Sequence, residues 1–184
     1  MPTNMTLDDN MIGVGKNVLH YLRQSLARDC GDQAAVYLQE AGFAGGEQVY
    51  ESFLGWLPDF TGVDDPANLD AETLGEVLSA FFEAMGWGAL TLEEAGKGAL
   101  MITALDWAES EPGGDSLQPS CYLSSGMLTD FLGRLASIPV AVMEVECRTR
   151  ADERCRFIAG APEMLDAIFD ALADGECYES VLNS

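Results

Sequence analysis

The sequence has very little positive charge. Lysine and arginine together number 9 against 31 aspartate and glutamate residues, which gives a formal net charge of -22. Because contact with phosphate groups requires concentrated basic side chains, this balance argues against binding to nucleic acid or to an anionic membrane. We interpret the acidic surface as a solubilising one. An alternative is a salt-rich cytoplasm, since Lys16 and Lys97 are the only lysines.

Several signatures of catalysis, export and membrane insertion are also missing. His20 is the only histidine, so a Ser-His-Asp triad is not indicated. No Gly-x-Gly-x-x-Gly motif opens a helix, and GVGKN (13–17) lacks the spacing of a phosphate loop. The apolar runs are too short to cross a bilayer, and no basic start precedes a hydrophobic segment. We therefore expect a cytoplasmic chain that is not an autonomous enzyme.

The composition is sufficient for one folded domain. Hydrophobic residues make up 48% and charged residues 22% of the 184 residues, as in globular proteins. We expect a loose N-terminus over residues 1–14 and a single domain over residues 15–184. Five cysteines in a cytoplasmic chain favour metal binding or packing over a disulfide framework. Cys30 and Cys177, near the two ends, are interpreted as isolated core or surface residues.

Helical periodicity dominates the first half of the chain. It predicts helices over residues 16–28, 33–40 and 46–57, with the second ending at Gly42 and capped by Asp32. Asp70 then begins the clearest helix, in which apolar residues recur at helical spacing between residues 74 and 85.

From residue 89 onward the period changes to two. Alternation predicts strands over residues 89–93 and 98–107, with Met101 and Trp107 on the same face of the second. The remaining predicted elements are a helix over 122–135, a hairpin of strands over 139–145 and 154–158, and a helix from Pro162 to Gly175. Helices and strands segregated in this way predict an α+β fold, with an antiparallel sheet packed by helices.

Three of the five cysteines and one glutamate fall around the predicted hairpin. Cys147 and Cys155 flank its tip, Glu144 precedes Cys147 by three residues, and Cys121 opens the preceding helix. Three thiolates and one carboxylate form a four-donor set that zinc accepts. Because residues three apart on a straight strand point to opposite faces, such a site requires a β-bulge or a strand end near residues 144–148. Spacing alone leaves both a zinc site and separate buried thiols open.

The segment from Trp107 to Phe157 resembles the 4-vinyl reductase domain family. The matching text is DW (106–107), CYLSSGMLTDFLG (121–133), PVAVMEVEC (139–147) and ADERCRF (151–157). The family consists of small-molecule-binding domains whose fold is similar to the small subunits of the TRAPP tethering complex. A group within it senses phenol or xylene for transcription activators and holds a structural zinc by Cys, Glu, Cys and Cys at intervals of 23, 3 and 8 residues. The same intervals separate Cys121, Glu144, Cys147 and Cys155, so the resemblance implies a structural zinc on these four residues.

The resemblance also implies an apolar ligand cavity beside the zinc. Trp107 can stack on a flat ligand and donate a hydrogen bond from its indole N–H, although such aromatic residues are equally consistent with a plain core. The chain departs from the aromatic sensors at Pro112, which interrupts their W-x-x-S-x-E-A segment, and at Ala151, where the family commonly has glycine. The predicted ligand-binding residues are Trp107, Phe81, Phe82, Val142, Ser125 and Phe131.

Three functions remain open from the sequence. The first is a domain that binds or senses an apolar or aromatic small molecule, is stabilised by zinc and signals to a separate regulatory or enzyme partner. The second is an accessory carrier in bacteriochlorophyll 4-vinyl reduction, the reaction from which the family takes its name. The third is a protein-interaction module, because TRAPP-like folds often dimerise through helices. Val18, Leu22 and Leu26 are the candidate face for a homodimer.

Overall fold

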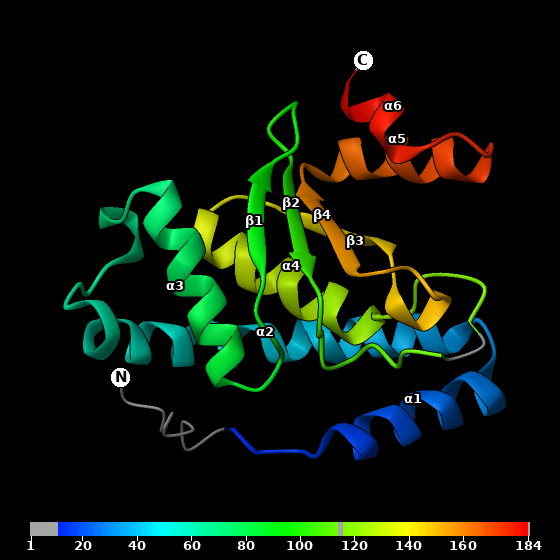
Figure 1. Cartoon of the computed structure of the whole chain (residues 1–184), viewed down its shortest axis with the longest axis horizontal. Coiled ribbons are helices and arrows are strands. Elements are labelled where there is room, and N and C mark those ends of the chain that lie inside the picture. The colour runs from blue at the N-terminus through cyan, green and yellow to red at the C-terminus, as the bar shows by residue number, and fades with distance from the viewer. Residues whose placement is uncertain (1–10, 114–115, 184) are drawn as a thin grey trace.

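The computed structural model describes residues 11–113 and 116–183 (Figure 1). Most of the N-terminal segment predicted to be loose lies outside these ranges. Within them, no helix is long and apolar enough to cross a membrane. The elements in chain order are α1 (Lys16–Cys30), α2 (Gln33–Thr61), the short 3-10 helix η1 (Pro66–Asn68), α3 (Ala71–Ala84), β1 (Thr91–Glu94), β2 (Leu100–Ala104), α4 (Tyr122–Ala136), β3 (Ala141–Glu146), the 3-10 helix η2 (Arg148–Arg150), β4 (Cys155–Gly160), α5 (Pro162–Ala173) and α6 (Tyr178–Leu182).

The four strands form one antiparallel sheet in the order β1-β2-β4-β3. β1 and β3 are therefore its edges, and β4 pairs with both β2 and β3. The hairpin predicted for the last two strands is confirmed, with Val142 opposite Ala159 and Glu144 opposite Phe157. The α+β fold with an antiparallel sheet packed by helices, predicted from the sequence, is also confirmed.

Helices cover both faces of this sheet (Figure 1). Ile102 and Phe157 point into the larger core, which they share with residues of α2, α3 and α4. Their neighbours Met101 and Ile158 point the other way and pack with residues of α5 and α6. Because successive side chains of a strand alternate between faces, each strand contributes to both cores.

α2 is one continuous helix of 29 residues, so the prediction of two helices separated at Gly42 was wrong. A Cβ atom on Gly42 would stand 2.0 Å from the backbone oxygen of Leu123 in α4, and one on Gly126 would stand 2.0 Å from that of Gln39 in α2. These two glycines let the backbones of α2 and α4 touch. The low helix propensity of glycine is outweighed here by packing, which the local pattern does not contain.

Two predicted helix caps have different outcomes. The Asp70 carboxylate accepts a hydrogen bond from the backbone N–H of Thr73 at 2.8 Å, which confirms it as the cap of α3. Asp32 stands before α2 but makes no capping hydrogen bond through its side chain, because its own backbone is already helical at φ -61° and ψ -24°. The short C-terminal helix α6 was not predicted.

Trp107 does not lie on the strand to which the alternation assigns it. β2 ends at Ala104, and the chain turns before Trp107. The indole therefore joins Ile102 and Ala104 in the larger core, on the opposite side of the sheet from Met101. The prediction that Met101 and Trp107 share a face was wrong because it extended the period of two through a turn.

Candidate functional site

The four predicted metal ligands converge. Cys121 precedes α4, Glu144 lies in β3, Cys147 follows β3, and Cys155 begins β4. Each offers one ligand atom, and these four atoms all lie within 4.8 Å of one another. All four residues are buried, with the three cysteines at most 1% exposed. The start of a helix and a hairpin that are distant in the sequence therefore meet at one cluster, which we call the Cys/Glu cluster.

A β-bulge makes this convergence possible, as the spacing of the residues requires. Glu144 pairs with Phe157, but Glu146 pairs with Arg156, so β3 advances by two residues while β4 advances by one. Val145 is the additional residue, and it packs toward α5 and α6. The shift returns Cys147 to the face of Glu144, although a straight strand would put them on opposite faces.

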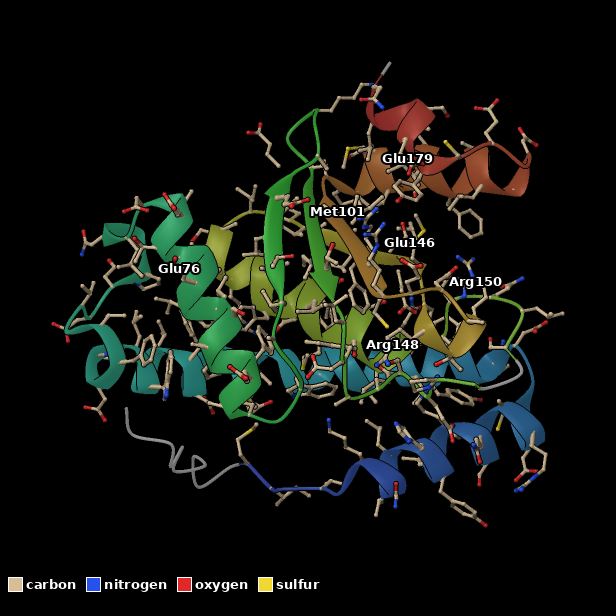
Figure 2. All side chains as sticks on the ribbon, in the orientation of Figure 1. Glu76, Met101, Glu146, Arg148, Arg150 and Glu179 are labelled. Atoms are coloured by element: carbon tan, nitrogen blue, oxygen red, sulfur yellow. The ribbon has the colours of Figure 1, made fainter. Side chains whose placement is uncertain are left out.

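The other face of the bulge is fixed by an ion-pair network. Glu146, on the side of α6, accepts hydrogen bonds from Arg154 at 2.8 Å, Arg156 at 2.9 Å and the Tyr178 hydroxyl at 2.7 Å (Figure 2). Burial opposes its negative charge, but these donors outweigh that effect and hold the pKa of Glu146 below its usual value. The network joins the bulged strand to β4 and to the C-terminal helix.

Glu144 carries one oxygen that has no protein partner. Its Oε2 accepts a hydrogen bond from the backbone N–H of Cys121 at 2.8 Å. Its Oε1 is buried and has no hydrogen-bond partner among the described residues. An isolated carboxylate oxygen is costly to bury, whereas a metal ligand in this position is satisfied by the cation. The donor chemistry, three sulfurs and one oxygen, fits a tetrahedral zinc ion.

The electrostatics of the protein alone also favour a cation in the cluster. Burial and the neighbouring negative charge on Cys147 raise the pKa of Glu144 to about 8. Burial, together with the adjacent thiols, raises the pKa of Cys121 well above its usual range. The sulfur atoms of Cys121 and Cys147 are 3.8 Å apart. Several acids held so closely in a dry site cannot all ionise unless a positive charge compensates them.

A turn fixes the backbone around Cys147. The Asp152 carboxylate accepts hydrogen bonds from the Cys147 N–H at 2.7 Å and from Arg150 at 2.9 Å. Ala151 closes the turn in the left-handed region at φ 70°. This is the position at which the family commonly has glycine, so the chain places an ordinary L-residue where one is disfavoured.

Glu109 is a second buried carboxylate, and the sequence analysis missed it. It is 0% exposed and accepts hydrogen bonds from the backbone N–H groups of Leu123 at 3.1 Å and Ser124 at 2.7 Å, at the start of α4. Arg23 of α1 forms an ion pair with it at 3.4 Å. Burial raises the pKa of Glu109, while Arg23 opposes that rise. No local motif reveals this carboxylate, because its cation comes from a helix at the other end of the chain.

Arg23 also connects α1 to the Cys/Glu cluster. It donates hydrogen bonds to the backbone oxygen of Glu109, to the backbone oxygen of Ser120 at 3.0 Å and to the Ser120 hydroxyl at 2.8 Å. The Ser120 hydroxyl in turn lies 3.8 Å from the sulfur of Cys147. One arginine thus ties the first helix to the segment that carries Cys121.

Four of the six predicted ligand-binding residues lie together beside the cluster. The ring centroids of Phe82 are 5.4 Å from Phe81, 5.4 Å from Phe131 and 5.8 Å from Trp107. All four rings are at most 1% exposed. The indole N–H of Trp107 donates to the Ser124 hydroxyl at 2.7 Å, so it already has a protein partner. The role of these rings in ligand binding stays a prediction.

The other two predicted ligand-binding residues lie elsewhere. Ser125 and Val142 line an open groove of about 290 Å³ between α2, α4 and β3, together with Phe43 and Thr129. A second groove of about 290 Å³ lies between α1 and the Cys/Glu cluster and is bordered by Arg23, Tyr122 and Thr149, among others. The predicted set is therefore divided between the aromatic core and a surface groove.

Comparisons with known structures support the fold. The chain is similar to the phenol-responsive sensory domain of the transcription activator PoxR with phenol, at 18% identity and a TM-score of 0.61, over 81% of this chain and 75% of that one. It is similar to a trafficking protein particle complex subunit 3 from Naegleria fowleri covalently bound to palmitic acid, at 13% identity and a TM-score of 0.60, over 78% and 90%. A vinyl-4-reductase family protein from Methanocaldococcus jannaschii aligns at 17% identity and a TM-score of 0.49, over 82% and 83%.

No curated protein matches the chain. The model of the 4-vinyl reductase domain family matches residues 109–161, a segment that begins at the buried Glu109 and includes the whole Cys/Glu cluster. The resemblance stated from the sequence is thereby confirmed, and the chain carries a 4-vinyl reductase domain.

Proposed function

We propose that this chain is a small-molecule sensor or binding domain whose β3–β4 hairpin is held by a structural zinc ion. The observation that carries the metal is the Cys/Glu cluster, four buried donors with one carboxylate oxygen left without a protein partner among the described residues. Zinc would be held by Cys121, Glu144, Cys147 and Cys155 and would fasten the start of α4 to the hairpin. Four protein ligands leave no open position for a substrate, so the zinc is structural rather than catalytic.

The ligand is proposed to be apolar or aromatic. The PoxR domain that shares this fold is phenol-responsive according to its description. In this chain the adjoining rings of Phe82, Trp107 and Phe131 form a fully buried aromatic group next to the cluster. Because these rings already fill their space, an entering ligand would have to displace them, which couples binding to the position of α3 and β2. The signal would pass to a separate cytoplasmic partner.

Native mass spectrometry of the freshly purified protein tests both parts of this proposal. We expect stoichiometric zinc on the wild-type chain and the mass of a retained apolar molecule on part of the sample. Glu144→Gln and Cys155→Ser should each lower zinc affinity at least about tenfold, because each replaces a ligand with a poorer donor. Cys30→Ser and Cys177→Ser are matched controls, since both cysteines lie outside the cluster. Equal zinc content in Cys155→Ser and Cys177→Ser would contradict the metal assignment.

A second candidate function, dimerisation, is favoured by the surface of α1. Val18 is 61% exposed, Tyr21 69% and Leu22 51%, and these residues lie on one face of the helix. Leu26, the third residue of the predicted face, is only half-buried. An apolar stripe of this kind on a charged protein is typical of a surface that another molecule covers.

A further inference from the structure

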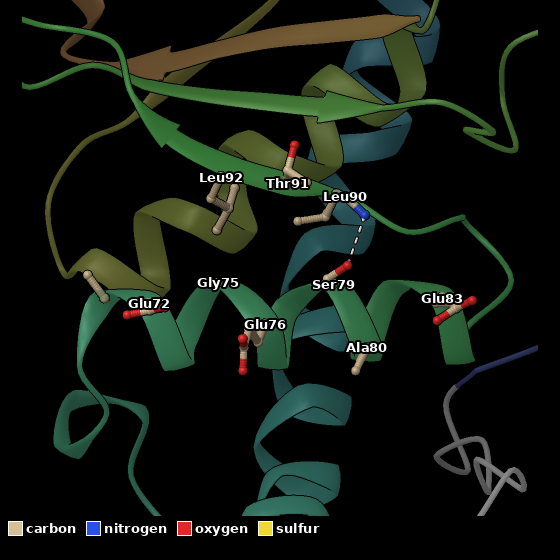
Figure 3. A pocket seen from close by; sticks show the side chains of 10 residues that line it. Glu72, Gly75, Glu76, Ser79, Ala80, Glu83, Leu90, Thr91 and Leu92 are labelled. Carbon is tan, nitrogen blue, oxygen red and sulfur yellow. Dashed lines mark hydrogen bonds between the residues drawn. The ribbon is translucent and has the colours of Figure 1, made fainter.

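A groove of about 500 Å³ lies between α3 and β1, outside residues 109–161 and away from the Cys/Glu cluster (Figure 3). Small residues of α3 form one side of its floor, among them Gly75, where an added Cβ would lie 3.8 Å from the Cβ of Leu92. Leu90 and Leu92 of the β1 segment form the other side. A helix and a strand thus border a shallow channel whose floor is uncharged.

The strand in this groove is an edge strand with free main-chain groups. β1 pairs only with β2. The N–H of Ala95 donates to the oxygen of Ala99 at 2.9 Å, which fixes the phase of the ladder, so the main-chain groups of Leu92 and Glu94 turn toward the free edge. The next N–H in that phase, at Leu90, donates to the Ser79 hydroxyl at 3.1 Å (Figure 3). Among the described residues, nothing bonds the outward groups of Leu92 and Glu94.

The borders of the groove are acidic. Glu72, Glu76 and Glu83 recur along α3 at helical spacing, and all three are exposed (Figure 3). Glu93 and Glu94 are exposed on β1. In the described part of the chain, none of these carboxylates takes part in an ion pair. A second copy of β1 placed antiparallel on this edge would bring like charges together, so self-pairing is disfavoured.

We propose that this groove binds an extended segment of a partner protein in which basic and small apolar residues alternate. The segment adds as a fifth strand to β1 and bonds the free main-chain groups of Leu92 and Glu94. Its apolar side chains lie on the floor of the groove, and its lysine or arginine side chains pair with Glu72 and Glu76. Main-chain bonds supply affinity in such strand addition, and the side chains select the sequence. This site is independent of the proposed zinc and ligand.

A synthetic peptide that alternates lysine and valine is the probe for this site. Hydrogen exchange followed residue by residue by NMR should show at least about tenfold slower exchange at the Leu92 and Glu94 amides when the peptide is added. The amide of Leu90 is the internal reference, because it is already bonded to Ser79 and should change little. A peptide that alternates glutamate and valine should produce no slowing. Binding that leaves the Leu92 and Glu94 amides unchanged would overturn the proposal.

Matched charge variants separate this site from general attraction to an acidic protein. Glu72→Gln with Glu76→Gln removes two charges beside the groove, and Glu163→Gln with Asp170→Asn removes two from α5 on the other side of the sheet. We expect the first pair to weaken peptide binding at least about tenfold and the second to leave it unchanged. Glu94→Pro should also weaken binding, compared with Glu94→Gln, because it removes an outward N–H that β2 does not use. Equal losses in the two charge pairs would show non-specific binding and refute the site.

Discussion

Glu109 and Glu144 are both buried carboxylates, and their surroundings give them different tasks. Glu109 accepts two backbone hydrogen bonds at the start of α4, accepts a third from the Ser124 hydroxyl and faces Arg23, so the protein satisfies it. Glu144 accepts one backbone hydrogen bond and keeps a buried oxygen without a partner among the described residues. A satisfied carboxylate stabilises the fold, whereas an unsatisfied one among thiols is suited to a cation.

The Arg23–Glu109 pair should contribute to stability mainly through what its loss would leave behind. Glu109→Gln leaves the Arg23 guanidinium buried without its counter-charge, and we expect the free energy of unfolding to fall by about 3 kcal/mol. Adding Arg23→Met removes the stranded charge and should recover part of this loss. Urea unfolding of the two single variants and the double variant measures the coupling between them.

If the double variant is destabilised by the full sum of the two single effects, the ion pair has no special role and each side chain acts alone. A loss confined to the amides of α1 in hydrogen exchange, with α2 and α4 unchanged, would instead show that Arg23 mainly attaches the first helix. Arg23 is the only buried residue of α1, a helix that the structure describes in full.

The two carboxylates also show what a sequence can and cannot reveal about individual residues. Glu144 was predicted as a ligand because the intervals to three cysteines are a local and repeatable pattern. Glu109 was not predicted, although it stands only two residues after Trp107. Its partner Arg23 is 86 residues earlier in the chain, and nothing in either neighbourhood marks the pair. Buried ion pairs made across the fold are invisible to spacing.

At the scale of elements, the crossing of α2 and α4 is the contact that depends most on single atoms. Gly42 faces the backbone of Leu123, Gly126 faces that of Gln39, and Gly46 lies against Asp130. The same α4 carries Cys121 at its start, so the position of this helix on α2 sets the position of one metal ligand.

Gly42→Ala and Gly126→Ala should therefore each be destabilising, although alanine is the better helix former. The added Cβ would meet a backbone oxygen, which cannot rotate away, and we expect a loss of at least about 2 kcal/mol. Gly45→Ala is the matched control, since it lies in the same helix as Gly42 with nothing within 4 Å of its Cβ. It should gain about 0.5–1 kcal/mol from helix propensity. Thermal or urea unfolding compares the three, and a gain in all of them would contradict the close crossing.

The elements themselves were predictable to different degrees for a physical reason. The bulge in β3 was expected because the donors Glu144 and Cys147 demand it, and the register shows it. The break at Gly42 was expected from propensity and is absent, because the neighbouring helix needs a residue without a side chain at that point. Patterns that include their own partners, such as a hairpin, are therefore more reliable than patterns completed by a distant element.

At the scale of the whole molecule, strong negative charge and an apolar first helix act in opposite directions. Each chain carries a formal charge of -22, which disfavours association in dilute salt. The exposed Val18 and Leu22 favour association, because burying them against a second copy removes apolar surface from water. The balance between these terms depends on ionic strength, since salt screens repulsion between exposed charges and leaves apolar contact intact.

We expect a homodimer through α1 whose affinity rises with added sodium chloride, the reverse of an association driven by opposite charges. Leu22→Glu should raise the dissociation constant at least about tenfold, which corresponds to about 1.4 kcal/mol. Leu117→Glu adds the same charge at a side chain that is 91% exposed outside α1, and it should have little effect. Sedimentation or light scattering across a salt series measures both. A chain that stays monomeric at every concentration, or that responds equally to the two substitutions, would remove α1 as an interface and leave its apolar face for a different partner.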